Sequence, residues 1–355
     1  MYHVILSGGS GTRFWPMSTQ NKPKQLIKIV KEKTMIRLTV NRIKKIADTK
    51  YILIIASNFL CKQIQKEIPE IPKKNYIIEP SPKNTAPAIA LAAINVLQRD
   101  LNAVMIIHPS DHMISGNKHF KKSINKGIEF AKNESALITL GIKPTYSSTA
   151  YGYIKYDSKD IPNYNGILKV NNFVEKPNNK NAKKYFLSNQ YFWNCGIFIW
   201  KASEILESMK KFMENDYAHI LKIYNSLNNQ NYNKILDKEW DLINKESIDY
   251  GILQKAKNVY TIMAQFKWSD LGSWKSFFDF VDKDENGSFY SGNVISINSS
   301  KNLIISPNKL TATIGLQNIT VINLNEMTLI LPTSEAESVK KLVTKIKSLN
   351  KDQYL

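Results

Sequence analysis

The chain has 355 residues, enough for one large domain or two of ordinary size. Hydrophobic residues make up 43 % and charged residues 22 %, which excludes a disordered chain and a collagen-like fibre. The net charge is +19, but 45 of the 49 basic residues are lysines, because arginine occupies only four positions: Arg13, Arg37, Arg42 and Arg99. The lysines are spread along the whole chain. Nucleic-acid-binding proteins usually carry arginines clustered on one face, and this sequence does not. We therefore expect a solvated basic surface and no specific nucleic-acid partner.

The sequence also bears on the location of the protein, through its hydrophobic segments and its cysteines. No window contains the roughly 18 apolar residues that span a bilayer, and no basic region precedes the first apolar run, so we expect neither a membrane segment nor a signal peptide. The two cysteines, Cys61 and Cys195, are too few for a disulfide framework or a zinc site. A reducing, cytoplasmic location is the expectation.

Short apolar runs alternate with helical patterns over the first two-thirds of the chain. Residues 4–6, 51–55, 76–78, 103–107 and 137–140 are predicted as buried strands, and 36–46 and 86–97 have helical spacing. Near-continuous apolar strands that alternate with helices are typical of a mainly parallel sheet covered on both faces. The predicted fold class is therefore α/β, with a Rossmann-like arrangement and a mainly parallel, mixed sheet.

The pattern changes after about residue 285. A charged, glycine-containing stretch at 282–292 predicts a linker, which divides the chain into a catalytic domain (1–285) and a C-terminal part (286–355). Short apolar runs near Val294, Leu303, Thr311, Ile319 and Thr328 predict strands stacked as coils or as a small sandwich. An amphipathic helix follows, to about residue 349, and the spacing of Ser334 and Glu337 predicts a capping box at its start.

A glycine-rich turn follows the first predicted strand. Gly8, Gly9 and Gly11 would let successive backbone N–H groups approach an anion, and a helix beginning just afterwards would add its positive dipole end. No Gly-Lys-Ser/Thr follows, so this is not a Walker A loop, and Phe14 stands where a dinucleotide fingerprint requires glycine. The glycines alone leave two interpretations open, a phosphate loop or a tight strand-to-helix turn.

The continuation of this turn carries a resemblance. Gly8-Gly9-Ser10-Gly11-Thr12-Arg13, then Trp15-Pro16 and Pro23-Lys24-Gln25, resemble the signature of mannose-1-phosphate guanylyltransferases, a family of sugar nucleotidyltransferases. The resemblance implies that Arg13 and Lys24 are catalytic and neutralise charge on the transferring phosphorus and the departing pyrophosphate. It also implies that the end of the first strand and the turn bind the nucleotide through Leu6, Gly8, Gly9, Gly11 and Thr12, together with Arg13 and Lys24.

Further blocks resemble the family in the same order. The segment with Glu79, Asn84, Thr85 and Pro87 resembles the base-reading region, with Lys83 where the family usually has arginine. A helix is also expected to begin near Thr85. Lysine keeps the charge of arginine but lacks its bidentate fork.

Two aspartates are implied to hold magnesium. Asp111, in His108-Pro109-Ser110-Asp111-His112, is implied to be a catalytic Mg²⁺ ligand, and Asp270 is implied to be the second. The two histidines of the first block leave a zinc site as an alternative, although no third ligand stands nearby in the sequence.

The sugar-phosphate site is implied by three blocks. They supply Gly152 and Tyr153, Glu175 and Lys176, and Asn194. In this resemblance Glu175 accepts hydrogen bonds from sugar hydroxyls and Lys176 holds the phosphate. Cys195 is interpreted as a small packed hydrophobic residue. The block 247–251 also matches, and no chemistry is assigned to it.

The implied reaction is transfer of GMP from GTP to mannose 1-phosphate, with Mg²⁺ as cofactor and pyrophosphate as the second product. The resemblance further implies a homo-oligomer, expected to be a dimer. Because some relatives continue into a phosphomannose isomerase domain, a monofunctional short form without it is expected. The alternatives are a sister enzyme with another sugar or base and an inactive binding protein on the same scaffold.

Overall fold

The computed structural model describes residues 1–9, 11–30, 33–161 and 164–355. They form two compact units, each built from three separate stretches of sequence. Unit 1 contains Met1–Gly8, Val40–Ser110 and Ser115–Phe266, and unit 2 contains Gly9–Thr39, Asp111–Ile114 and Lys267–Leu355. The predicted domain boundary near residue 285 stays a prediction. Among the described residues, no helix is long and apolar enough to cross a membrane.

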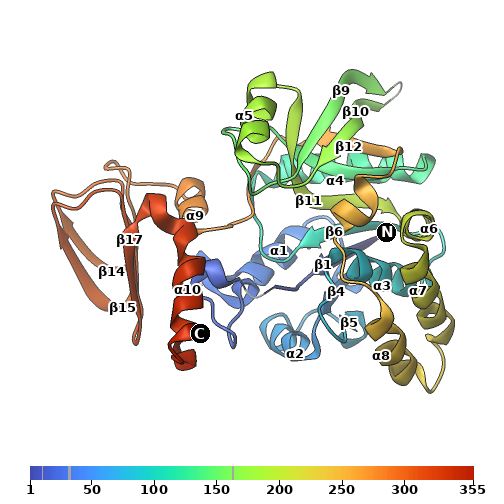
Figure 1. Ribbon diagram of the computed structural model, residues 1–355, viewed down its shortest axis with the longest axis horizontal. Coiled ribbons are helices and arrows are strands. Elements are labelled where there is room, and N and C mark those ends of the chain that lie inside the picture. The colour runs from blue at the N-terminus through green and yellow to red at the C-terminus, as the bar shows by residue number, and fades with distance from the viewer. Residues whose placement is uncertain (10, 31–32, 162–163) are drawn as a thin grey trace. The chain divides into compact units, whose positions relative to one another are not determined.

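Unit 1 is built on a nine-stranded mixed sheet (Figure 1). The strand order is β5-β4-β1-β6-β11-β8-β12-β10-β9. The strands are β1 (Tyr2–Leu6), β4 (Ile52–Ala56), β5 (Tyr76–Ile78), β6 (Val104–Pro109), β8 (Leu137–Ile142), β9 (Tyr153–Ile161), β10 (Tyr164–Val174), β11 (Tyr191–Lys201) and β12 (Val259–Met263). Pairing is parallel from β5 to β6 and between β8 and β12, whereas β11 runs antiparallel to its neighbours. The five predicted strands are confirmed as β1, β4, β5, β6 and β8.

The period-2 alternation of the strands explains why helices cover both faces of this sheet. Val4, Leu53 and Met105 pack in one core cluster with α3, whereas Ile5 and Ile54, also fully buried, are outside it. Helix α4 packs on β6, β8, β11 and β12. The helices of unit 1 are α2 (Asn58–Glu67), α3 (Thr85–Leu97), α4 (Asn117–Asn133), α5 (Asn179–Ser188), α6 (Ala202–Phe212), α7 (Glu214–Ser226) and α8 (Tyr232–Leu242), with short turns η3 (Thr49–Tyr51), η4 (Lys73–Asn75) and η5 (Asp249–Leu253).

Unit 2 contains a four-stranded sheet in the order β14-β15-β16-β17. The strands β14 (Phe289–Ile297), β15 (Leu303–Ile314) and β16 (Ile319–Asn323) are parallel, and β17 (Thr328–Pro332) is antiparallel to β16. The runs predicted separately near Leu303 and Thr311 therefore form one long strand. Consecutive parallel strands joined by short turns are the stacked-coil form of the prediction, and the structure does not support the sandwich form.

The remaining elements of unit 2 are short. They are η1 (Thr12–Phe14), η2 (Lys24–Leu26), β2 (Lys28–Val30), β3 (Lys33–Thr34), β7 (Met113–Ser115), β13 (Lys267–Ser269), α9 (Trp274–Phe280), η6 (Thr333–Ser338), α10 (Val339–Ser348) and η7 (Asp352–Tyr354). The last residue of β7, Ser115, already belongs to unit 1, and helix α1 (Met35–Ile43) begins in unit 2 and ends in unit 1. Helix α1 ends three residues earlier than the predicted 36–46.

Two predictions about helix starts are wrong. The C-terminal helix begins at Val339, and the predicted capping pair Ser334 and Glu337 lies in the preceding 3₁₀ segment η6. The hydroxyl of Ser338 donates to Glu335 at 2.8 Å and caps no backbone N–H. After the glycine-rich turn, the expected helix is a single 3₁₀ turn, η1, so it has too few aligned peptides for an appreciable dipole.

The core of unit 2 joins residues from both ends of the chain. Phe14 and Trp15 pack in one cluster with Trp274, with strand residues such as Leu303 and with Val339 of α10. The indole N–H of Trp274 donates to the carbonyl of Trp15 at 3.0 Å, and that of Trp15 donates to the carbonyl of Tyr354 at 2.7 Å. The C-terminal segments therefore support the turn that follows the glycines.

Candidate active site

A cavity of about 430 Å³ lies in unit 2, next to the glycine-rich turn. Its lining carries three cations and two carboxylates: Arg13, Lys24 and Lys340, with Asp111 and Asp270. The other lining residues are Gly11, Thr12, Phe14, His112, Leu271 and Gly272. A concave surface that carries several positive charges is suited to a polyphosphate. The structure therefore brings together the four charged residues that the sequence predicted to act on phosphate.

The glycine at position 11 is required by a close approach of two backbone segments. Gly11 has φ +61°, and a Cβ atom there would lie 2.2 Å from the Cβ of Lys24. The hydroxyl of Ser18 donates to the Gly11 carbonyl at 2.5 Å. The close approach of Gly11 to Lys24 places Lys24 directly beside the turn. Gly9, with φ +107°, also has a conformation that favours glycine, and Ser10 lies outside the described residues.

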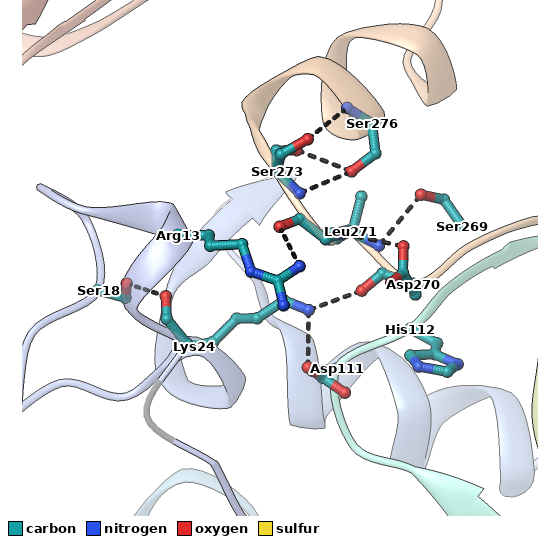
Figure 2. A network of polar contacts seen from close by, with 12 residues as sticks. Arg13, Ser18, Lys24, Asp111, His112, Ser269, Asp270, Leu271, Ser273 and Ser276 are labelled. Carbon is teal, nitrogen blue, oxygen red and sulfur yellow. Dashed lines mark hydrogen bonds and ion pairs between the residues drawn. The ribbon is translucent and has the colours of Figure 1, made fainter. Parts of the chain in front are cut away.

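Lys24 connects the segment that contains Asp111 to the loop that contains Asp270 (Figure 2). Its ammonium donates to Oδ2 of Asp111 at 2.7 Å and to the backbone carbonyl of Asp270, also at 2.7 Å. Lys24 is only 7 % exposed, so its charge is little screened by solvent. Burial raises the pKa of Asp111, but Lys24 and His112 lower it by more, so the net shift is downward. Asp111 is thus an ionised carboxylate at neutral pH.

The loop with Asp270 is shaped by its own hydrogen bonds. The Gly272 N–H donates to Oδ1 of Asp270 at 3.0 Å, and Arg13 donates from Nη1 to the Gly272 carbonyl at 3.2 Å. Leu271 has φ +47°, a strained value for a residue with a branched side chain. Directly after the loop, Ser273 and Ser276 form a reciprocal capping box that begins α9. Figure 2 shows Arg13 and Lys24 converging on this loop.

The two aspartates fit a hard divalent cation better than zinc. Asp111 and Asp270 line the same cavity, and carboxylate oxygens are the ligands that Mg²⁺ prefers. Over residues 1–9, 11–30, 33–161 and 164–355, no group of three His, Cys, Asp or Glu side chains could hold a metal by itself. A cation bound here would need substrate phosphates and water as further ligands. His108 stacks on His3 while the Trp268 indole donates to His112, so the two histidines share no zinc site.

The predicted base-reading residues lie in unit 1, after β5 and at the start of α3. Asn84 has φ +72° and its side chain accepts from the Thr85 N–H at 2.8 Å, which starts α3 where the sequence predicted it. Glu79 accepts from the Lys83 N–H at 3.1 Å, and burial raises the pKa of its carboxyl. Pro87 is buried in the first turn of α3. Asn84 is exposed, so its side chain is the most accessible of the set.

Lys83, the residue that departs from the family pattern, has a partner of its own. Its ammonium donates to the backbone carbonyl of Asp241 at 3.0 Å. Leu6 is the last residue of β1, and Gly8 is the last residue before the chain passes from unit 1 into unit 2. The neighbouring parallel strand β6 ends at Pro109, opposite Leu6, and is followed by Asp111. The turn and Asp111 thus both follow carboxyl ends of adjacent parallel strands, the usual place for ligands in such folds.

The predicted sugar residues also lie together in unit 1. A Cβ atom at Gly152 would lie 2.5 Å from Oε2 of Glu175 and 3.4 Å from the Cβ of Asn194, so these three residues adjoin. Lys176, with φ +43°, forms an ion pair with Glu175. Tyr153 is fully buried and its hydroxyl accepts from the Ser148 N–H at 2.9 Å. The whole of Tyr153, backbone included, is therefore covered by the surrounding protein.

Sequence reasoning missed two charged residues that the structure places beside these sites. Lys340, an exposed lysine of α10, lines the cavity beside the glycine-rich turn, and no sequence signal separates it from the other lysines. Asp249 accepts a hydrogen bond from Asn194 at 3.0 Å. It lies in the 247–251 block, which matched the family without an assigned role.

Cys61 and Cys195 are free and buried, and burial raises their pKa values to about 11 and about 12, so both are neutral thiols.

These features define an α/β protein with a charged cavity beside a glycine-rich turn, and comparisons with known proteins place it more closely. Residues 2–287 match the family profile described as nucleotidyl transferase, and residues 292–346 match the profile described as MannoseP isomerase/GMP-like beta-helix domain. The chain is 30 % identical to mannose-1-phosphate guanylyltransferase 2 of Escherichia coli O157:H7, over 99 % of this chain and 74 % of that one. It is 32 % identical to the xanthan biosynthesis protein XanB of Xanthomonas campestris (strain B100), with the same coverage.

A solved structure confirms the fold. The crystal structure described as mannose-1-phosphate geranyltransferase from Thermus thermophilus superposes with a TM-score of 0.88 at 22 % identity, over 98 % of this chain and 99 % of that one. The chain belongs to the nucleotidyl transferase family, in the group of the mannose-1-phosphate guanylyltransferases. The resemblance stated from the sequence is thereby confirmed, as are the α/β fold and the β-rich C-terminal part.

Proposed function

We propose that the protein transfers GMP from GTP to mannose 1-phosphate and releases pyrophosphate. The observation that carries the proposal is the arrangement of Arg13, Lys24, Asp111 and Asp270 around one cavity. In the reaction, an oxygen of the sugar phosphate forms a bond to the α-phosphorus of GTP. The bond from that phosphorus to the oxygen bridging to the β-phosphorus breaks, and pyrophosphate leaves with the electron pair. The attacking phosphate is already ionised near neutral pH, so no general base is needed.

Positioning and charge account for most of the catalysis in phosphoryl and nucleotidyl transfer. Arg13 and Lys24 would face the β- and γ-phosphates and stabilise the charge that builds on pyrophosphate as it leaves. Lys24 is already fixed by Asp111 and by the Asp270 carbonyl, so little reorganisation is required when substrate binds. Backbone N–H groups of Gly8, Gly9, Gly11 and Thr12 would add neutral donors to the same phosphates.

The family to which the chain belongs generally uses a divalent metal. We propose that Asp111 and Asp270 hold Mg²⁺, which when bound would screen the phosphate charge and orient the α-phosphate. Asp111 would have to share its carboxylate between the ion and Lys24.

Specificity would come from the unit 1 residues. Glu79, Asn84, Thr85 and Pro87 would form the base site. Gly152, Glu175, Lys176 and Asn194 would bind mannose 1-phosphate, with Tyr153 buried directly after Gly152. The predicted homodimer and the cytoplasmic location remain proposals of the same kind.

The test is a pyrophosphate-release assay of the purified protein over a panel of nucleoside triphosphates and hexose 1-phosphates. We expect the highest kcat/KM with GTP and mannose 1-phosphate, and no turnover after chelation of divalent metal. A clear preference for another base or sugar would assign the protein to a sister activity on the same fold. No release with any pair would indicate a binding protein and overturn the proposal.

A further inference from the structure

The side-chain amide of Asn194 is held in one orientation by three partners. The N–H of Gly196 donates to Oδ1 of Asn194 at 3.1 Å, and the hydroxyl of Thr139 donates to the same oxygen at 2.8 Å. Because a backbone N–H can only donate, these contacts identify the oxygen without ambiguity. A carbonyl oxygen has two lone pairs, so both are used. The amide of Asn194 can therefore only donate to a ligand.

The nitrogen of the same amide points to Asp249. Nδ2 of Asn194 donates one of its two hydrogens to Oδ1 of Asp249 at 3.0 Å. One N–H is left for a substrate oxygen, and its direction is set by the plane of the amide. Without Asp249 the amide would keep its contacts at Oδ1, but nothing at its nitrogen end would resist rotation.

The position of Asp249 is itself fixed. The chain around it is attached to the proposed base segment, since the Glu246 N–H donates to the Lys83 carbonyl and the Ala86 N–H donates to the Glu246 carbonyl, each at 3.1 Å. The Ile248 N–H also donates to the Thr85 hydroxyl at 2.8 Å. On the other side, a Cβ atom at Gly251 would lie 2.7 Å from the sulfur of Met213, so this segment packs closely on the core.

We propose that Asp249 is a positioning residue of the sugar-phosphate site, which acts by aiming the remaining N–H of Asn194 at the hexose. The inference rests on the proposed function of this site in binding a sugar 1-phosphate. It adds to that function a residue that need not touch the substrate and that links the sugar segment to the base segment. Asn194 then recognises an acceptor oxygen of the sugar phosphate, such as a hydroxyl oxygen, and discriminates against a substrate lacking it.

The protonation of Asp249 gives this arrangement a measurable signature. Burial, and then the negative charge of Glu175, raises the pKa of Asp249 to about 7, with Lys176 acting in the opposite direction. The charged groups that face it are thus Glu175 and Lys176, and its neutral partner is Asn194. The ionised carboxylate accepts the amide N–H more strongly than the protonated acid does. Binding of the sugar phosphate should therefore tighten as pH rises through about 7.

The experiment measures KM for the sugar 1-phosphate that the wild-type protein uses best. Asp249→Ala should raise this KM on the order of tenfold, the usual effect of losing one hydrogen bond to a charged group. KM for the nucleotide should change less than about twofold, within the error of such measurements. Asp249→Asn, whose amide oxygen can still accept from Asn194, should recover most of the loss. The control Asp237→Ala, at an exposed site on α8, should leave both KM values unchanged.

Two readouts separate positioning from general destabilisation. The pH dependence of KM between pH 6 and 8 should be shallower in Asp249→Asn than in the wild type. The slope that remains in Asp249→Asn comes from ionisation of the substrate phosphate. In an Asn194→Ala background, Asp249→Ala should have little further effect, because the two residues act as one unit. Multiplicative effects of the two substitutions, or identical pH profiles, would overturn the inference. Failure of the proposed function would instead appear in the wild type, as preference for another substrate.

Discussion

The ammonium of Lys24 lies 2.7 Å from a carboxylate oxygen of Asp111, although 87 positions separate the two residues. The pair is asymmetric, because Lys24 is buried whereas the Asp111 side chain remains 30 % exposed at the cavity surface. The carboxylate of Asp111 therefore remains accessible from the cavity that it lines.

Removal of the Lys24 charge should affect turnover more than substrate binding. Lys24→Met keeps much of the aliphatic length but deletes the donor to Asp111 and to the Asp270 carbonyl. We expect kcat to fall on the order of 10²-fold or more, the usual effect of losing a donor to developing charge. Lys22→Met, two positions away and exposed, is the matched control. A Lys24→Met enzyme within about threefold of the wild-type kcat, well inside that range, would remove Lys24 from the mechanism.

The two aspartates should behave as one unit toward magnesium. Asp111→Asn and Asp270→Asn should each abolish most activity and raise the Mg²⁺ concentration needed for half-maximal turnover. The double variant should be scarcely worse than either single variant, because groups that share an ion are not additive. Steady-state rates over a magnesium titration measure both effects. Losses that multiply, with an unaltered magnesium requirement, would show that the aspartates do not share an ion.

Lys340 should contribute to phosphate binding, although it belongs to the C-terminal helix. Its side chain lines the cavity with Arg13 and Lys24, whereas its neighbour Lys341 is exposed and lines none of the described cavities. Lys340→Gln should raise KM for GTP, and for pyrophosphate in the reverse reaction, by about threefold to tenfold, as expected for a partly screened charge. The effect should shrink as salt increases. Equal effects of Lys340→Gln and Lys341→Gln would indicate only a change in net charge.

A buried histidine pair should make the stability of unit 1 sensitive to acid. His3 and His108 stack with ring nitrogens 2.9 Å apart, so one ring must donate to the lone pair of the other. Burial lowers the pKa of His3 to about 3, and burial together with His3 and Arg42 lowers the pKa of His108. The unfolded chain therefore binds more protons between pH 3 and 6.5, and stability is lost as pH falls through this window. For His3 the loss at pH 5 is about 2 kcal/mol.

Thermal melts between pH 5 and 8 measure this effect. The wild-type Tm should fall toward pH 5, and His3→Asn should show a shallower fall from a lower starting Tm. His119→Asn, at an exposed position of α4, should retain the wild-type slope. Parallel profiles for the wild type and His3→Asn would show that the buried pair does not control acid sensitivity.

The sequence was most informative where burial alone decides structure. The apolar runs that form β1, β4 and β6 are buried on both faces, so hydrophobic pattern and strand position coincide. Ser334 and Glu337 had the spacing of a capping box, but tertiary packing of Ala336 and Val339 started the helix later. Local spacing cannot reveal such a shift, because the competing contacts come from distant segments.

The charged residues of the site could not be predicted from local sequence patterns alone. Nothing near Asp111 or Asp270 in the sequence indicates that Lys24 will contact both, and only the family resemblance selected them. Lys340 could not be selected at all, since an exposed lysine on a basic helix has no distinguishing neighbour. For Asp249, the raised pKa depends on burial and on Glu175, which lies 74 positions earlier (249 − 175), so no reading of the 247–251 block predicts it.

The shared core of unit 2 limits how this chain can be recombined. The two family profiles meet between residues 287 and 292, so this is the point at which a chimaera with another C-terminal part would be joined. Yet Phe14, Trp15 and Trp274 on one side of the junction are packed with Leu303, Ile322 and Val339 on the other. A foreign C-terminal part would leave these aromatic rings without their partners and expose the back of the glycine-rich turn to water. Any exchange of the C-terminal part must therefore carry with it the residues that pack against it, far earlier in the sequence.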